Sequence, residues 1–122
     1  MSSPPYYLLL GPEIGRKSEF IDSIRKTLTS EYGEPPEEIR IYPDKGNMSE
    51  IIGLLRNSSL FSAHRLVIFS EAQEIKNKAD VELLVEYLEH PTRASTLILT
   101  SDGFKIDSRI DKKIGSRGKK IF

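Results

Sequence analysis

The segment Ser58–Phe69, SSLFSAHRLVIF, joins two halves of contrasting character. Its last four residues, at 66–69, are all large and apolar, which predicts a buried strand. Its first half places Leu60 and Phe61 side by side among small polar residues. Neighbouring residues of a helix point about 100° apart, so a buried face could hold both only at its broad edge. The pair therefore either completes the core, as most apolar pairs do, or projects outward as a wedge for another protein's pocket.

The rest of the chain alternates short apolar runs with amphipathic segments. Strands are expected at 6–10, 39–42, 66–69, 96–100 and 120–122. Helices are expected at 14–29, 48–55, 77–88 and 106–114, with Asn47 and Asn77 as N-caps and a break from Gly115 to Gly118. Strands that are nearly all apolar and alternate with helices indicate an α/β fold. We expect three layers, a parallel sheet with helices on both faces.

Composition excludes several classes of protein. The 122 residues predict a single domain, residues 1–122, and 18 basic against 18 acidic residues give no overall charge that calls for nucleic acid or membrane. The absence of cysteine excludes disulfides, thiolate catalysis and cysteine-bound zinc. The two histidines are far apart and show no metal-ligand spacing, so no metal is expected. Without a signal peptide or a membrane-length apolar run, the expected location is the cytoplasm.

A phosphate-binding loop is nearly present at GPEIGRKS, where the first expected strand turns into a helix. The working pattern is Gly, four residues, then Gly-Lys-Ser/Thr. Lys17 and Ser18 are in register with Gly11, but Arg16 stands where the second glycine is required and Gly15 comes one position early. Such a loop turns backbone amides toward a phosphate in conformations that side chains penalise. We therefore favour an ordinary strand-to-helix turn.

A second element of nucleotide hydrolysis is also altered. Nucleotide hydrolases of this architecture end the strand corresponding to 66–69 in Asp-Glu, with the aspartate holding magnesium through water. Here these positions are Ser70 and Glu71, and serine cannot supply that charge. Two defects in two essential elements indicate an ATPase fold that has lost its activity, with no catalytic residues and no cofactor. The alternative is a P-loop NTPase with a variant loop.

Two further features have a structural and a functional interpretation. His64, beside Arg65, is expected to form a strand-end hydrogen bond or to be polar decoration rather than to act as a base. The stretch from Lys105 onward carries seven basic and two acidic residues. Such a face could contact DNA, but no aromatic residues interleave to stack on bases. A solvated amphipathic helix is therefore the favoured interpretation.

Three segments, taken in order, carry a resemblance to a known family. They are Tyr7–Glu13, an opening strand with a Gly-x-Glu turn; Ser59-Leu60-Phe61 followed by Arg65-Leu66-Val67; and the leucine-rich helix at 82–90 followed by the strand at 95–99. Over nearly its whole length the chain resembles the N-terminal domain of the delta subunit of the bacterial DNA polymerase III clamp loader. The resemblance rests on the order and spacing of these segments together.

The resemblance implies an AAA+-like fold without a working nucleotide site, and a protein that is not an enzyme. In this family the domain binds the ring-shaped beta sliding clamp and helps to open it for loading onto primed DNA. By position, the clamp-binding residues are Ser58, Ser59, Leu60 and Phe61, with the Leu-Phe pair entering an apolar pocket. Other loader subunits are implied as partners of the full-length protein, DNA contact as indirect or weak, and membrane contact as absent. The family's second AAA+-type domain and its collar are expected to be absent from this chain.

Overall fold

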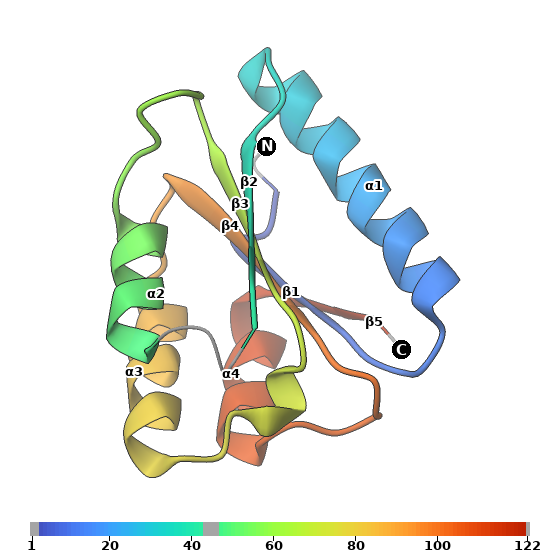
Figure 1. The fold of residues 1–122 in the computed structure, drawn as a ribbon, viewed down its shortest axis with the longest axis vertical. Coiled ribbons are helices and arrows are strands. Elements are labelled where there is room, and N and C mark those ends of the chain that lie inside the picture. The colour runs from blue at the N-terminus through green and yellow to red at the C-terminus, as the bar shows by residue number, and fades with distance from the viewer. Residues whose placement is uncertain (1–2, 43–46, 122) are drawn as a thin grey trace.

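The computed structural model describes residues 3–42 and 47–121, which form a parallel sheet between two layers of helices (Figure 1). The strands are β1 (Tyr6–Leu9), β2 (Glu37–Ile41), β3 (Arg65–Phe69), β4 (Ser95–Thr100) and β5 (Lys119–Ile121). Their order in the sheet is β2-β3-β4-β1-β5, and every neighbouring pair is parallel. The helices are α1 (Ile14–Tyr32), α2 (Met48–Arg56), α3 (Lys78–Glu89) and α4 (Ser108–Arg117), with a short 3₁₀ turn at Ala72–Glu74.

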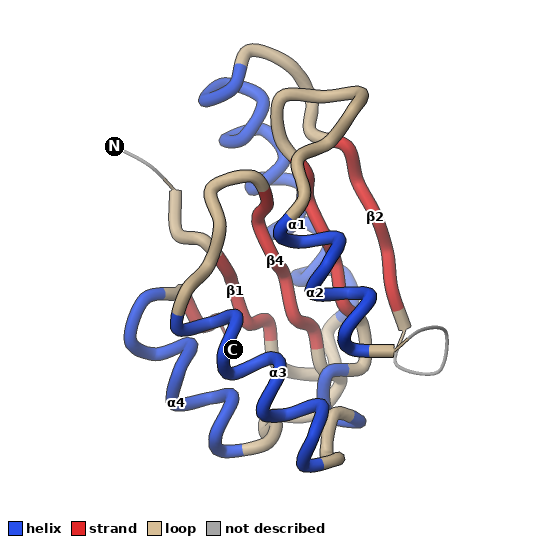
Figure 2. Tube along the Cα trace, turned by 90° about the vertical axis from the view of Figure 1, so that its left-hand side faces the viewer, coloured by secondary structure: helices blue, strands red, loops and turns tan. Residues whose placement is uncertain are grey.

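Both faces of the sheet are covered, as the nearly all-apolar strands predicted. Helices α2, α3 and α4 lie side by side on one face, and α1 lies on the other (Figures 1 and 2). Alternate side chains of β1 enter the two layers: Tyr6 and Leu8 pack toward the three helices, and Tyr7 and Leu9 pack toward α1. Because β1, β3 and β4 are buried on both faces, their sequences have no polar alternation, whereas the edge strand β2 alternates between buried and exposed residues.

Helix α1 covers its face of the sheet with one apolar stripe. Ile21, Ile24 and Leu28 are its buried residues, at the spacing of a helical face. The helix runs three residues past the expected end, to Tyr32, and stops at Gly33. That glycine has φ 82°, and its amide donates to the carbonyl of Thr29 at 2.9 Å. A glycine in the left-handed conformation is a common helix end.

The two asparagine N-caps are confirmed. The Asn47 side chain accepts from the Glu50 amide at 2.8 Å, and its own NH₂ group donates to the Glu50 carboxylate at 2.8 Å. Asn77 accepts from the amides of Ala79 and Asp80. These bonds satisfy first-turn donors that have no partner within the helix.

The last helix corrects one expectation. The break expected from Gly115 is wrong, because α4 continues through Gly115 to Arg117 and ends at Gly118. Ile110 and Ile114 are fully buried against the core, and this packing outweighs the roughly 1 kcal/mol that glycine costs inside a helix. The helix begins at Ser108, with Asp107 as its N-cap, rather than at 106.

Strands β1, β3 and β4 differ from their expected bounds by one residue, and β2 and β5 differ in ways that the structure explains. Strand β2 begins at Glu37, two residues early, because Glu37 pairs in register with Arg65 and its amide donates to the carbonyl of His64 at 2.9 Å. Strand β5 begins at Lys119, and Phe122, expected at its end, lies outside the described residues. Within the described part of the chain, no helix is both long enough and apolar enough to cross a bilayer.

Candidate functional site

The most exposed large apolar side chains in the described structure are Leu60, at 90%, and Phe61, at 85%. They lie in the loop that joins α2 to β3, which projects beyond the end of α2 (Figure 2). The alternative that this pair completes the core is therefore wrong. A loop that holds two adjacent large apolar groups in water presents a ready contact for another protein.

The hydroxyl of Ser59 organises this loop from within. Its Oγ accepts hydrogen bonds from the backbone amides of Phe61 and Ser62, each at 3.1 Å, and donates to a carboxylate oxygen of Glu37 at 2.5 Å. The Ser62 hydroxyl donates to the carbonyl of Pro35 at 2.8 Å. Ser58 is exposed beside this turn. Of the two serines expected to contact a partner, Ser59 is thus engaged inside the loop.

A buried arginine joins this loop to the rest of the fold. The Arg65 guanidinium donates to the carbonyls of Leu54 at 2.7 Å and Asn57 at 3.2 Å, and its Nε lies 3.2 Å from the Glu37 carboxylate. The hydrogen bond from Ser59, followed by that from Arg65, lowers the pKa of Glu37 below its ordinary value. Sequence reasoning missed Glu37, because the strand was expected to begin at residue 39 and Glu37 stood two positions before it.

His64 is buried beside this arginine. Its Nε2 lies 2.8 Å from the Thr96 hydroxyl oxygen, and its ring stacks on Tyr32 with centroids 4.2 Å apart. Burial lowers the pKa of the imidazole below its ordinary value. The expected hydrogen bond is present, and the ring is enclosed rather than open to a substrate.

The loop that resembles a phosphate-binding loop follows the C-terminal end of β1. It therefore lies at the other end of the strands from the Leu60-Phe61 loop, which precedes β3. The Lys17 ammonium donates to the carbonyl of Ser101 at 3.1 Å and lies 3.3 Å from the Asp102 carboxylate. The Gly11 amide, at a glycine with φ 108°, donates to the carbonyl of Gly103 at 2.8 Å. The lysine and the first glycine of the pattern thus both bond to the segment that follows β4.

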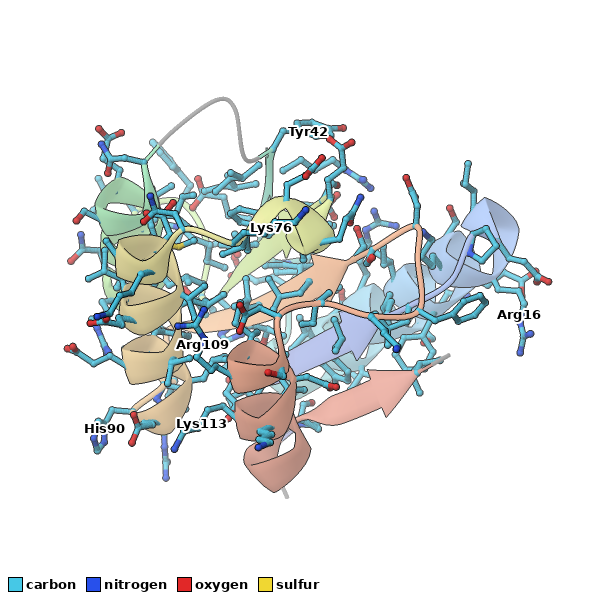
Figure 3. The ribbon with its side chains drawn as sticks, turned by 90° about the horizontal axis from the view of Figure 1, so that it is seen from below. Arg16, Tyr42, Lys76, His90, Arg109 and Lys113 are labelled. Carbon is cyan, nitrogen blue, oxygen red and sulfur yellow. The ribbon has the colours of Figure 1, made fainter. Side chains whose placement is uncertain are left out.

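The remaining residues of this pattern face solvent. Arg16 extends outward from the start of α1 (Figure 3), with its Nε 3.8 Å from the Glu13 carboxylate. Ser18 and Gly15 are also exposed, and Gly15 does not have the positive φ that Gly11 has. A groove of about 380 Å³ opens beside this loop, and its apolar lining comes from Leu9, Leu10, Pro12, Phe20, Phe104 and Ile121.

Ser70 and Glu71 lie at the same end of the sheet as the Gly11 loop, because the C-terminal ends of parallel strands meet on one side. The Ser70 amide donates to the carbonyl of Ile41 at 2.9 Å, which extends the pairing of β3 with β2. Glu71 is exposed and has φ 57° and ψ 45°, a left-handed conformation that begins the 3₁₀ turn. The structure therefore brings these two residues and the Gly11 loop to the C-terminal ends of the strands. It places Leu60 and Phe61 at the N-terminal ends.

Two basic residues of α4, Arg109 and Lys113, form local ion pairs. Arg109 pairs with Asp107 at 2.9 Å, and Lys113 lies 3.5 Å from the Glu89 carboxylate. Figure 3 shows both on the side of the molecule away from Arg16, so these two cations do not gather with Arg16. Across residues 3–42 and 47–121, no three His, Asp or Glu residues form a group that could hold a metal ion.

Comparison with protein families identifies the chain. Residues 7–117 match the model described as DNA polymerase III, delta subunit. This chain belongs to the delta subunit family. The match includes the exposed Leu60-Phe61 loop, the Gly11 loop, all of β1 except Tyr6, and the elements from α1 to α4. The expected family membership is thereby confirmed.

Solved structures share the fold of this delta-family chain. The DNA clamp loader delta protein of Bacillus subtilis superimposes with a TM-score of 0.75 at 19% identity. A DNA polymerase III gamma subunit-related protein of Thermotoga maritima gives 0.65 at 16% identity. Each comparison covers 98% of this chain but only 38% and 41% of those proteins. Comparison with curated proteins gave no match. The α/β fold is therefore shared with these two proteins, and the chain spans about two-fifths of their length.

Proposed function

We propose that this delta-family chain is a non-catalytic clamp-loader module of DNA replication, which binds the beta sliding clamp through Leu60 and Phe61. By this contact it helps to open the ring for loading onto primed DNA. The observation that carries the proposal is the exposure of two adjacent large apolar side chains in a loop that is held by hydrogen bonds to the Ser59 hydroxyl. Burying each in a pocket contributes about 1.5–3 kcal/mol, and such central anchors dominate protein interfaces.

The proposed contact segment is residues 58–61. Ser58 is exposed and free to lie at the rim of the interface, whereas Ser59 supports the loop. The other loader subunits are proposed partners of the full-length protein in the cytoplasm. DNA contact is proposed to be indirect or weak, which agrees with the ion pairs of Arg109 and Lys113.

The nucleotide site is proposed to be degenerate. A phosphate would need the Gly11 amide and the Lys17 ammonium, and both already bond to the segment after β4. Ser70 also lacks the charge that holds magnesium through water. Titration with Mg-ATP should therefore give no binding at millimolar nucleotide. Saturable binding would favour the alternative, a P-loop NTPase with a variant loop.

Calorimetric titration of the chain with purified beta clamp tests the clamp contact. The double variant Leu60→Ala/Phe61→Ala should lose measurable binding while its free energy of unfolding stays within about 0.5 kcal/mol of the wild type, because both side chains are exposed. Ile14→Ala is the matched control, since Ile14 is 73% exposed at the opposite edge of the sheet, and it should bind as the wild type does. Equal affinity of the double variant and the wild type would exclude the proposed contact.

A further inference from the structure

Leu60 and Phe61 stand at the end of a continuous chain of polar contacts that starts at the end of α2. We infer that Glu37 and Arg65 are positioning residues, which fix the loop in its binding conformation before the partner arrives. This inference rests on the proposed clamp contact through Leu60 and Phe61. It assigns a role in recognition to two side chains that themselves lie behind the exposed pair.

Arg65 is the anchor of this chain of contacts. Its side chain is only 10% exposed, and its guanidinium donates to the carbonyls of Leu54 and Asn57 at the C-terminal end of α2. The last carbonyls of a helix have no partner within the helix and carry the negative end of its dipole. A guanidinium with several donors in one plane can satisfy two of them and still reach a carboxylate. The end of α2 is thereby tied to the first residue of β3.

Glu37 connects Arg65 to the loop. Its carboxylate oxygen Oε1 receives both Arg65 Nε at 3.2 Å and the Ser59 hydroxyl at 2.5 Å. The backbone of Glu37 is itself fixed by the pairing of β2 with β3. Glu37 lies in register with Arg65, and its amide donates to the carbonyl of His64. A single carboxylate oxygen therefore holds Ser59, which precedes the apolar pair, to the strand that follows it.

Ser59 completes the chain of contacts at the apolar pair. With its hydroxyl hydrogen committed to Glu37, its oxygen is free to accept from the amides of Phe61 and Ser62. This side-chain turn fixes the backbone on the C-terminal side of Leu60. Water alone would favour the collapse of two large apolar side chains onto the protein surface. The bonded turn keeps them projecting, at 90% and 85% exposure.

The functional consequence is preorganisation. A loop that becomes ordered only on binding loses backbone and side-chain entropy at that moment, which weakens the affinity. A loop that is already held by Glu37 and Arg65 avoids most of this loss. Removing the Glu37 carboxylate should thus weaken clamp binding without touching any atom of the interface.

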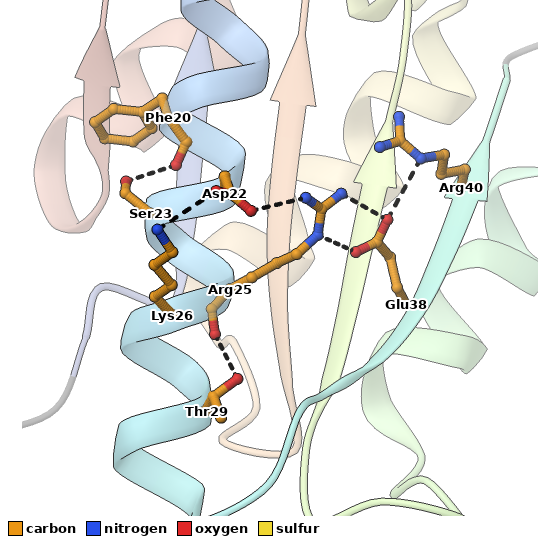
Figure 4. A network of polar contacts seen from close by, with 8 residues as sticks. All are labelled: Phe20, Asp22, Ser23, Arg25, Lys26, Thr29, Glu38 and Arg40. Carbon is orange, nitrogen blue, oxygen red and sulfur yellow. Dashed lines mark hydrogen bonds and ion pairs between the residues drawn. The ribbon is translucent and has the colours of Figure 1, made fainter.

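The test compares Glu37→Ala with Glu38→Ala. The two glutamates are neighbours in β2, and each is paired with an arginine, but Glu38 bonds to Arg25 of α1 instead (Figure 4). We expect Glu37→Ala to lower the affinity for the clamp about tenfold, the effect of losing hydrogen bonds to a charged group. Glu38→Ala should bind as the wild type does. Glu37→Gln, which keeps an acceptor oxygen for Ser59, should recover part of the loss.

Hydrogen exchange of the free chain supplies a second readout that a merely stabilising role would not change. The amides of Phe61 and Ser62 should exchange faster in Glu37→Ala and in Ser59→Ala, but not in Glu38→Ala. Ser59→Ala also serves if Glu37→Ala does not fold. Unchanged exchange, or affinity within twofold of the wild type while Leu60→Ala/Phe61→Ala does not bind, would overturn the positioning role and leave the clamp contact standing. A wild-type chain that does not bind the clamp would overturn both.

Discussion

The Lys17 ammonium lies 3.1 Å from the carbonyl oxygen of Ser101 and so joins the first turns of α1 to the end of β4. The side chain is only 13% exposed, and its ammonium also lies 3.3 Å from the Asp102 carboxylate. In a phosphate-binding loop this lysine would reach toward the ligand phosphates. Here the same side chain stabilises the fold by joining α1 to the segment after β4, which agrees with the proposed loss of nucleotide binding.

Lys17→Met should therefore cost stability. A hydrogen bond from a charged donor contributes about 1.5–3 kcal/mol, and the free energy of unfolding should fall by an amount in that range. Lys26→Met is the matched control in the same helix, because Lys26 is 80% exposed and forms only a long ion pair with Asp22. That change should stay within about 0.5 kcal/mol. Urea unfolding followed by circular dichroism measures both, and equal effects would show that the Ser101 bond contributes nothing.

Two glycines should respond to alanine in opposite directions. A Cβ at Gly15 meets nothing within 4 Å, and the residue lies in α1, so Gly15→Ala should stabilise by about 0.5–1 kcal/mol. A Cβ at Gly118 would lie 2.8 Å from the carbonyl oxygen of Tyr6 and would also overlap two carbons of the Tyr6 ring. Gly118→Ala should destabilise by about 1–3 kcal/mol through overpacking.

Thermal and urea unfolding of the two glycine variants give the comparison directly. Destabilisation by Gly15→Ala would mean that this glycine is needed for its backbone, as the glycines of a working phosphate-binding loop are. An unchanged midpoint for Gly118→Ala would mean that β5 and α4 shift apart at no cost. The pair of variants thus tests both the degenerate loop and the packing of the last strand.

Local and short-range chemistry made much of the fold predictable from the sequence. The apolar runs of β1, β3 and β4 indicated strands buried on both faces, and Asn47 and Asn77 marked the starts of two helices. The break at Gly115 was wrong because the burial of Ile110 and Ile114, a tertiary effect, outweighs the local cost of glycine.

The candidate site was only partly predictable. The residue types around Leu60 and Phe61 favoured core by themselves, and the resemblance to a family of clamp-binding subunits reversed that interpretation. The link between Glu37 and Arg65 could not be predicted, because the two residues are 28 positions apart and meet only through the register of β2 and β3. The bond of Lys17 to the Ser101 carbonyl was equally hidden, since a backbone acceptor leaves no mark in the sequence.

His64 should make stability depend on pH between about 5.5 and 7.5. Its imidazole is 3% exposed, stacks on Tyr32 and contacts the Thr96 hydroxyl, and burial lowers its pKa from the ordinary 6.5. As the pH falls through 6.5, the unfolded chain binds a proton at this residue that the folded chain does not. The free energy of unfolding should therefore decrease, by at most about 1.4 kcal/mol per pH unit, until the pH reaches the lower pKa of the folded state.

Urea unfolding at several pH values measures this dependence, and His64→Gln isolates it. The variant should be less stable than the wild type at pH 7.5, because it loses the stacked ring. Its free energy of unfolding should nevertheless change less between pH 7.5 and 5.5. His90→Gln, which replaces the exposed histidine at the end of α3, is the matched control and should keep the wild-type slope. The same slope in His64→Gln and the wild type would show that the buried imidazole takes up its proton equally well in both states.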